Sequence, residues 1–249
     1  MANPALIKQI IKSVRSLPGW PQLRVLDLSC GDGEILEILA RDGCEVEGTH
    51  FRSDDYIYRQ PKDILRAITV HEHVDLTQPL PLPDASYDVV IATEVLEHLP
   101  AHAPLCAEVS RVLKPGGYWL FSTPNIHRIH SRFQFFWTGQ HELRSARLGW
   151  DVPASELYST HHNPVYLPVM HALLYQQKMR MRRTYFTNCR LLSWLYLPLW
   201  PLLAIAAAIE VRHAMKRSPE GGRDLLKWLV EPRSLLSEKW VVLAQKSCP

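Results

Sequence analysis

The sequence predicts an α/β protein with a doubly wound, mostly parallel sheet. Three observations carry this prediction. Short apolar runs alternate with helical patterns through the first half of the chain. The runs are continuously apolar, as expected of strands that are buried on both faces. A glycine-containing turn joins the first strong strand to a helix, which is typical of a ligand-binding βα unit.

Five apolar runs in the first half have the length of buried strands, at residues 23–29, 44–51, 67–73, 87–93 and 118–123. Helical patterns cover residues 33–41 and 101–113, and the second ends at a Lys-Pro-Gly-Gly sequence. The later part of the chain predicts a helix at 164–177 and strands at 179–186 and 239–246, whereas 126–158 contains no clean strand. Strands and helices therefore alternate as expected of a sheet covered on both faces.

Composition limits the class of protein. The chain has 249 residues, of which 47% are hydrophobic and 21% charged, as expected of one large folded domain over 1–249. Five cysteines without CxxC spacing argue against a disulfide framework or a zinc site and favour a reducing, cytoplasmic setting. Lysines interrupt the apolar N-terminal residues, which predicts an amphipathic helix and not a signal peptide.

A cofactor site is expected where the first strand ends. The sequence Leu-Asp-Leu-Ser-Cys-Gly-Asp-Gly over residues 26–33 follows that strand and opens a helix. Glycines let the backbone turn sharply and approach a ligand, and the helix start offers unpaired N–H groups. In a doubly wound sheet this turn lies at the edge where ligands bind.

Three segments give a resemblance to a known family. They are VLDLSCGDG, VDLTQPLPLPDASYDVVIATEVLEHL and RVLKPGGYWLFSTPN. In order and spacing they resemble the class I, Rossmann-like S-adenosylmethionine (SAM) dependent methyltransferases of types 11 and 12, over residues 23–171. The resemblance implies a seven-stranded sheet of order 3-2-1-4-5-7-6. Strand seven, at 239–246, would be antiparallel, and a hydrophobic helical insertion would precede it.

The resemblance also implies residues that contact SAM. They lie at the ends of successive strands and are Asp27, Ser29, Gly31 and Gly33 at the methionine part, Asp75 and Leu76 at the adenine, and Thr93. The end of strand two usually carries an acid that binds the ribose, but His50 stands there. Either His50 binds the ribose differently, or Asp54 or Asp55 reaches it.

A divalent metal site is predicted after strand four. If a helical turn begins at Glu94, then Glu94, Glu97 and His98 share one face, and two carboxylates with an imidazole suit a divalent cation. The Glu-x-x-Glu-His pattern resembles small-RNA 2′-O-methyltransferases and ubiquinone-pathway O-methyltransferases. This implies His161 as a further ligand and Mg²⁺ or Mn²⁺ as the metal. Two alternatives stay open: a metal-free site in which His98 is the general base, and a structural role.

Two insertions are expected to serve the acceptor. Residues 124–160 form a substrate cap whose arginines and aromatics suit a sugar or phosphate, or pack a helix on the sheet. Its candidate contacts are Arg128, Arg132, Phe133, Phe136 and Trp137.

The second insertion, 187–237, contains an uncharged stretch at 191–209, with Arg190 before it and Arg212, Lys216 and Arg217 after it. We expect a helical hairpin or wedge that docks on the inner leaflet of the cytoplasmic membrane. A subunit interface, as in a homodimer, and a full membrane span are the alternatives.

These patterns predict a SAM-dependent O-methyltransferase. Its acceptor would be a hydroxyl of a sugar, a polyol, or a lipid-linked glycan or natural product. An RNA 3′-end 2′-O-methyltransferase is one alternative, although no RNA-binding module is visible and a nucleic-acid partner is not expected. An inactive, membrane-associated scaffold is the other, and its support is His50 in place of an acid.

Overall fold

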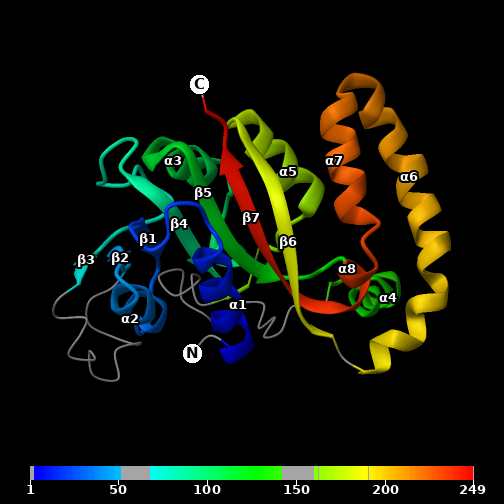
Figure 1. Cartoon of the computed structure of the whole chain (residues 1–249). Helices are drawn as coiled ribbons and strands as arrows, with labels where there is room; N and C mark the ends of the chain where they lie inside the picture. The colour runs from blue at the N-terminus through cyan, green and yellow to red at the C-terminus, as the bar shows by residue number, and fades with distance from the viewer. Residues whose placement is uncertain (1–2, 52–67, 142–159, 162, 190, 249) are drawn as a thin grey trace.

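A computed structural model describes residues 3–51, 68–141, 160–161, 163–189 and 191–248. It contains a seven-stranded sheet of order β3-β2-β1-β4-β5-β7-β6, which confirms the predicted order (Figure 1). The strands are β1 Arg24–Leu28, β2 Glu45–Thr49, β3 Thr69–His71, β4 Tyr87–Thr93, β5 Leu113–Pro124, β6 Met179–Cys189 and β7 Ser237–Lys246. β7 is antiparallel to both neighbours, whereas the other pairs are parallel.

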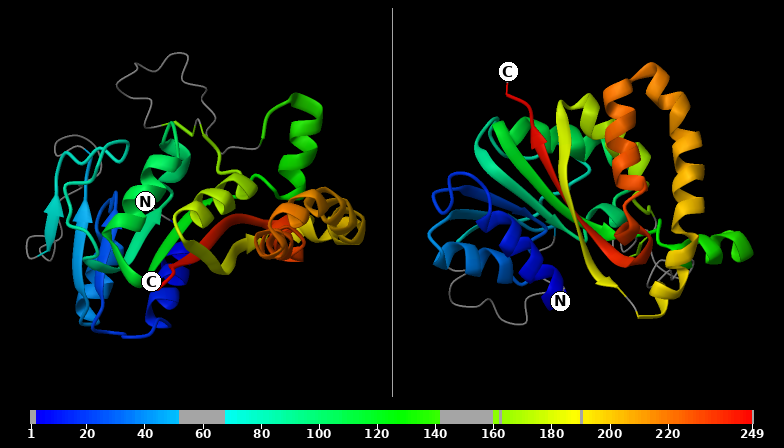
Figure 2. Two further views of the ribbon diagram at one scale, coloured as in Figure 1. Left: turned by 90° about the horizontal axis from the view of Figure 1, so that it is seen from above. Right: turned by 45° about the vertical axis from the view of Figure 1, so that its right-hand side comes forward.

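Helices cover both faces of the sheet (Figure 2). They are α1 Pro4–Arg15, α2 Glu34–Arg41, α3 Ala103–Val112, α4 Ile129–Thr138, α5 Leu167–Gln176, α6 Trp200–Arg217, α7 Pro219–Leu229 and α8 Pro232–Leu236, with short 3₁₀ segments η2 Leu96–His98 and η4 Leu191–Leu199. The expected N-terminal amphipathic helix is α1, whose buried residues recur every three or four positions.

Two hydrophobic cores lie on opposite faces of the sheet. Val89 and Ile91 of β4 join the core that contains α1 and α2. Val90 and Ala92 of the same strand join the core that contains α3 and α5. Because successive strand residues point to opposite faces, a strand buried on both faces must be apolar throughout. This explains why β4 reads as a continuous apolar run in the sequence.

The strand register brings several loop residues to one edge of the sheet. Leu28 pairs with Ala92, Thr93 pairs with Ser122, and Pro124 pairs with Lys239. The carboxyl ends of β1, β4 and β5 therefore lie side by side, and the start of the antiparallel β7 joins them. Neighbouring strands are about 4.8 Å apart, so side chains at these ends can contact one ligand.

β5 is longer than the sequence predicted. The prediction placed its start at residue 118, after the Lys-Pro-Gly-Gly sequence, but the strand begins at Leu113. Leu113 of β5 pairs with Tyr87 of β4, and the register shifts before the next pair, Val89 with Tyr118. The turn residues are thus part of an irregular strand, and the helix before it ends at Val112. A bulge of this kind has no clear sequence signal.

The helical insertion between the last two strands begins and ends at one point of the sheet. Cys189 at the end of β6 is the register partner of Ser237 at the start of β7. Between them, η4 leads into α6, and α7 returns alongside α6 as a hairpin (Figures 1 and 2). The hairpin and α4 lie at the β6 end of the molecule, away from β3.

Candidate active site

The turn after β1 has the backbone of a ligand-binding loop. Ser29, Gly31 and Gly33 all have positive φ, at 59°, 57° and 73°. Gly33 caps the N-terminus of α2, and Ser29 N donates to Thr49 Oγ1 at the end of β2 (3.0 Å). The turn therefore presents the start of α2, with its unpaired N–H groups, to the carboxyl edge of the sheet.

Gly48 of β2, which sequence reasoning did not single out, allows this turn to sit close to the sheet. A Cβ at Gly48 would lie 2.8 Å from Cys30 Sγ and 2.8 Å from Leu36 Cδ1. A side chain at this position would force the Cys30 and Leu36 side chains to move. A glycine inside a strand often marks such a close approach, and that was the available signal.

Asp27 is buried in the centre of the sheet, directly before the turn. It pairs with Gly48 on one side and Ile91 on the other, and it is 2% exposed. Burial raises the pKa of its carboxyl to about 8. Within the described part of the chain, Oδ1 has no hydrogen-bond partner. An acceptor oxygen in this position suits a cationic or N–H-bearing ligand.

His50 lies against the turn. Its Nε2 is 3.3 Å from the carbonyl oxygen of Gly31, and the side chain is buried. Its backbone joins the ends of two strands, because its N–H donates to His71 O and its carbonyl accepts from Val74 N. A carbonyl only accepts, so Nε2 carries the proton if the two bond. Asp54 and Asp55 lie outside the described residues.

The remaining predicted SAM contacts lie along the same edge. Asp75 is half-buried, and its Oδ1 accepts both the N–H and the hydroxyl of Thr77 at 2.8 Å. Leu76 is 9% exposed and belongs to the core on the α3 side. Thr93 ends β4, and its hydroxyl is buried without a partner among the described residues.

Glu94 forms an ion pair that sequence reasoning missed. It has a φ of 56°, so the expected helical turn begins only at Leu96 and Glu94 stands before it. Ser122 Oγ donates to its Oε1 (3.1 Å), and Lys239 Nζ contacts its Oε2. Lys239 had no sequence signal, because only the β5–β7 pairing brings it to this edge.

Glu97, His98 and His161 converge beside this pair. Their ligating atoms lie within 4.8 Å of one another, and the two imidazole rings meet edge to face with centroids 4.6 Å apart. Glu97 is fully buried, and neither carboxylate oxygen has a hydrogen-bond partner among the described residues. Burial, with the nearby Glu94, raises the pKa of the Glu97 carboxyl. Glu94 is not one of the three converging residues.

Backbone contacts hold these side chains in place. His98 Nδ1 lies 3.2 Å from Thr160 O, which fixes Nδ1 as the protonated nitrogen if it donates there. Asn163 donates its N–H to Glu97 O and its side-chain amide to Leu99 O. The segment that carries His161 is therefore attached to η2, although 62 residues separate Thr160 from His98.

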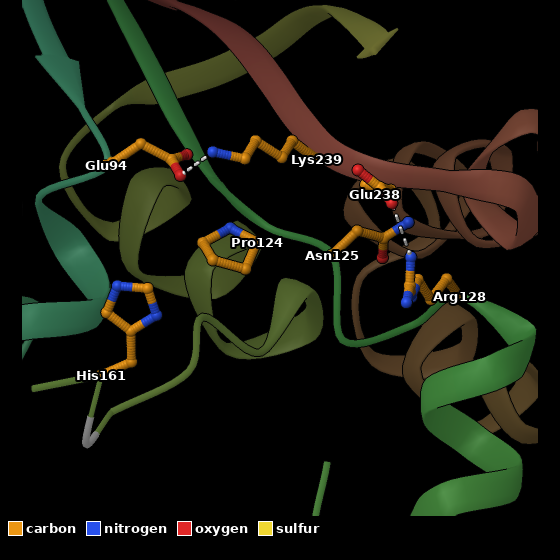
Figure 3. A pocket seen from close by; sticks show the side chains of 7 residues that line it. All are labelled: Glu94, Pro124, Asn125, Arg128, His161, Glu238 and Lys239. Atoms are coloured by element: carbon orange, nitrogen blue, oxygen red, sulfur yellow. Dashed lines mark hydrogen bonds and ion pairs between the residues drawn. The ribbon is translucent and has the colours of Figure 1, made fainter. Parts of the chain in front are cut away.

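A small pocket of about 60 Å³ opens beside Glu94 (Figure 3). Most of its lining residues are polar or charged, with charges of both signs; the lining residues are Glu94, Pro124, Asn125, Arg128, His161, Glu238 and Lys239. In Figure 3 the Glu94–Lys239 pair and the Glu238–Arg128 pair lie on opposite sides of Pro124. Arg128, which was expected to contact the acceptor, thus lines the pocket at the N-terminus of α4.

The far wall of this pocket is rigidly built. The Asn125 side-chain amide donates to Ser234 O (2.6 Å) and Ser237 O (3.0 Å), and Asn125 Oδ1 accepts from His127 N. His127 stacks between Tyr166 and Trp240, with ring centroids 5.3 and 5.1 Å away. These contacts fix the chain direction at the start of α4.

The sequence is similar to those of known methyltransferases. Residues 26–121 match a methyltransferase domain family. The ubiquinone biosynthesis O-methyltransferase of Vibrio cholerae is 30% identical over 130 residues, which cover 49% of each chain. The Sodalis glossinidius enzyme of the same name is 29% identical over 188 residues, 66% of this chain and 72% of its own. The chain spans about half the length of the first curated relatives it matches.

The fold is also similar to that of solved methyltransferase structures. An S-adenosylmethionine dependent methyltransferase from Mesorhizobium loti superposes with a TM-score of 0.55 at 17% identity, covering 98% of this chain and 99% of that one. The strand order and this superposition show the Rossmann-like fold of class I methyltransferases, as predicted, and the family match over residues 26–121 supports a SAM-dependent methyltransferase. Within that class, both curated relatives compared above are O-methyltransferases.

Proposed function

We propose that this chain transfers a methyl group from SAM to a hydroxyl oxygen of a sugar, a polyol, or a lipid-linked glycan or natural product. The observation that carries the proposal is the convergence of Glu97, His98 and His161 next to the carboxyl ends of β1 and β4. These groups can position a hydroxyl and accept its proton. Glu97 and His98 lie in η2, just after β4, the strand adjacent to β1 and to the turn that would hold the donor.

The residues along the sheet edge fit SAM. The unpartnered Oδ1 of Asp27 suits the ammonium of the methionine part, and the open turn at Gly31, where a Cβ would meet nothing within 4 Å, leaves room for a ligand. Asp75 uses only Oδ1 for its contacts with Thr77, so Oδ2 is placed to accept from the adenine amine. His50 would contact the ribose with one ring nitrogen. When bound, SAM supplies an electrophilic methyl group on sulfonium sulfur.

The reaction needs a base as well as a donor. The new O–C bond forms as the S–C bond of the donor breaks, and the hydroxyl proton must leave the acceptor. In a site without metal, His98 is suited to receive it, because donation from Nδ1 to Thr160 O leaves the lone pair on Nε2. With a metal bound, that lone pair would coordinate the ion, and the proton of the acceptor hydroxyl would pass to water. His161 meets the His98 ring edge to face and lines the pocket where an acceptor would enter.

We also propose that Glu97, His98 and His161 hold Mg²⁺ or Mn²⁺. Their ligating atoms lie within 4.8 Å of one another, so a small inward movement would give the roughly 3 to 4.2 Å expected when each lies about 2.1 Å from one ion. A buried carboxylate without a hydrogen-bond partner is stabilised by a cation. Such an ion lowers the pKa of a hydroxyl that it binds. Glu94, the fourth expected ligand, would stay paired with Lys239.

The acceptor class follows from the pocket and its surroundings. Carboxylates, an arginine, a lysine and an amide line it, which suits a hydroxyl-rich molecule better than an apolar one. The pocket is small, so most of the acceptor would lie outside it, against residues 124–141 of the proposed cap. Residues 142–159 of that cap lie outside the described part of the chain. A lipid-linked acceptor would place the protein at the cytoplasmic face of a membrane, and an apolar helix of 20 residues, Trp194–His213, is available for that contact.

Two measurements test the proposal. Isothermal titration with SAM is expected to give micromolar binding, and the complete absence of binding would refute it. Methyl transfer from labelled SAM is then measured with polyol, sugar and catechol acceptors, with and without EDTA. Glu97→Gln and His161→Ala are expected to lose activity and Mn²⁺ binding together. Glu72→Gln, which replaces an exposed carboxylate directly after β3, is expected to retain both. Full activity in EDTA with both variants active would exclude the metal.

The same experiments separate the alternatives. Methylation of an RNA 3′ end, with salt-dependent filter binding, would favour the RNA 2′-O-methyltransferase. Flotation with vesicles in the absence of any SAM binding would favour an inactive scaffold. Either result would replace the proposed acceptor or the proposed catalysis.

A further inference from the structure

Helices α4 and α6, with the 3₁₀ segment η4, carry an apolar surface that the described residues leave exposed. We call it the α4–α6 surface and define it by six side chains, which are Phe136 (74% exposed), Trp137 (76%), Trp194 (50%), Leu202 (66%), Ile205 (59%) and Ile209 (65%). The Phe133 and Tyr196 rings, 5.8 Å apart, join the two parts. Only 6% of the segment Trp194–His213 is buried. Large exposed apolar patches mark interaction sites.

One stripe of α6 changes from apolar to basic along the helix. Leu202, Ile205, Ile209, Arg212 and Lys216 are spaced three and four residues apart, so they lie on one face, and all five are exposed. The apolar part spans about 10 Å and Arg212 follows about 5 Å further, at 1.5 Å rise per residue. One leaflet of hydrocarbon is about 15 Å thick. The stripe therefore matches the apolar depth and the headgroup level of a single leaflet.

The charges and aromatics select a membrane as the partner. Exposed tryptophans on α4 and η4 are the side chains that prefer the membrane–water interface. Arg212 and Lys216 complement anionic headgroups. A second copy that met this face symmetrically would bring Arg212 and Lys216 close to their own counterparts, and the acid that α6 exposes beside them is Glu210 alone among its described side chains. Like charges would therefore oppose that pairing, whereas anionic headgroups would not.

The fold permits insertion into one leaflet but not a simple crossing. The insertion leaves and rejoins the sheet at the register partners Cys189 and Ser237, so α6 and α7 must enter and leave from the same side. α7 exposes Glu220, Arg223 and Lys227 along its length. Charged residues of this kind favour the interface and oppose burial in the bilayer centre.

We therefore propose that the α4–α6 surface inserts into the cytoplasmic leaflet of an anionic membrane. Arg128, the N-cap of α4, lines the pocket, so insertion would place the pocket near the headgroups. The consequence for a lipid-linked acceptor rests on the proposed function, but membrane binding itself needs neither SAM nor acceptor.

Co-sedimentation of the full chain with vesicles tests the proposal. Vesicles of phosphatidylcholine with 30% phosphatidylglycerol, a composition of our choosing, are expected to bind about tenfold or more tightly than phosphatidylcholine alone. Leu202→Glu with Ile205→Glu is expected to weaken binding about tenfold or more. Val169→Glu is the matched control, since Val169 is 49% exposed on α5, and it should bind normally.

The basic part of the stripe is tested by charge reversal. Arg212→Glu with Lys216→Glu is expected to remove the preference for anionic vesicles, whereas Lys8→Glu with Lys12→Glu, an exposed pair of equal spacing on α1, leaves it unchanged. Titration with SAM on every variant separates loss of membrane binding from loss of the donor site. If the wild type binds no vesicles, or if Leu202→Glu with Ile205→Glu instead converts a dimer to a monomer in solution, the proposal is wrong.

Discussion

Lys239 and Glu94 form an ion pair at the edge of the pocket although 145 positions separate them in the chain. Lys239 is the register partner of Pro124 on β5, and Glu94 follows the β4 residue that pairs with Ser122. Both side chains are less than one-fifth exposed. Because this partly buried pair engages the Glu94 carboxylate, we expect Lys239 to decide whether Glu94 can join Glu97 at the proposed metal.

Replacing Lys239 is therefore expected to change metal binding. Lys239→Met releases Glu94, which becomes available as a fourth ligand, and we expect Mn²⁺ affinity to rise several-fold. Glu94→Gln in the wild-type background is expected to change Mn²⁺ affinity by less than twofold, because Glu94 is already engaged. Titration followed by electron paramagnetic resonance measures both affinities. A fall in affinity for Lys239→Met would contradict this account of the pair.

Asp27→Asn is expected to stabilise the SAM-free protein while weakening SAM binding. Burial raises the pKa of Asp27 to about 8, above the value near 4 in an unfolded chain. Between these two pKa values the folded state binds more protons than the unfolded state. The contribution of Asp27 to the free energy of unfolding therefore falls as pH rises, by up to about 1.4 kcal/mol per pH unit.

Urea unfolding at pH 5, 6, 7 and 8 should show a shallower decline for Asp27→Asn than for the wild type. SAM affinity should fall about tenfold, the size expected for one lost charge-assisted hydrogen bond. Asp42→Asn, at the far end of α2, is the control and should bind SAM normally. Equal pH slopes in the wild type and Asp27→Asn would contradict the assigned role of burial.

His127 is expected to make the protein acid-sensitive. Burial lowers the pKa of His127 to about 3, from about 6.5 in an unfolded chain. As pH falls from about 6.5 to about 3, only the unfolded state gains the proton. The free energy of unfolding therefore keeps its full value, as far as His127 is concerned, above about pH 6.5 and falls by up to about 1.4 kcal/mol per pH unit below it.

His127→Phe retains a ring between Tyr166 and Trp240 but cannot be protonated. Its unfolding free energy between pH 6.5 and 4 should decline less steeply than that of the wild type, even if it is lower at pH 7 because Leu167 N loses its acceptor. His130→Phe, on the exposed start of α4, is the comparison and should retain the wild-type slope.

Gly48→Ala is expected to destabilise the fold by about 1 to 3 kcal/mol, the usual result of overpacking. The new methyl would overlap Cys30 Sγ and Leu36 Cδ1, and the displaced turn should also bind SAM more weakly. Adding Cys30→Ala removes one of the two overlaps, so the double variant should recover part of the stability. No recovery in a double-mutant cycle would place the strain elsewhere.

The sheet could be predicted from the sequence because burial on both faces forces continuous apolar strands, as in β4. The turn after β1 could be predicted because Gly31 and Gly33 occupy positive φ, a backbone conformation that favours glycine. Contacts that depend on distant pairing could not. Lys239 reaches Glu94 only through the β5–β7 register, and Glu94 precedes the helical turn because of its own backbone conformation.

His50 shows a further limit. The sequence located it at the end of β2 in place of an acid, but only the structure places its ring against the Gly31 carbonyl. A pattern of residue types identifies which position is unusual. The backbone around that position decides which atoms the unusual side chain meets.

The register between Cys189 and Ser237 has a consequence for how such a protein can diversify. Because the insertion departs from and rejoins adjacent strands at facing residues, a longer, shorter or wholly different hairpin would leave every strand alignment intact. The hairpin that we propose binds the membrane can thus be exchanged during evolution while the sheet edge proposed to bind the donor is inherited unchanged.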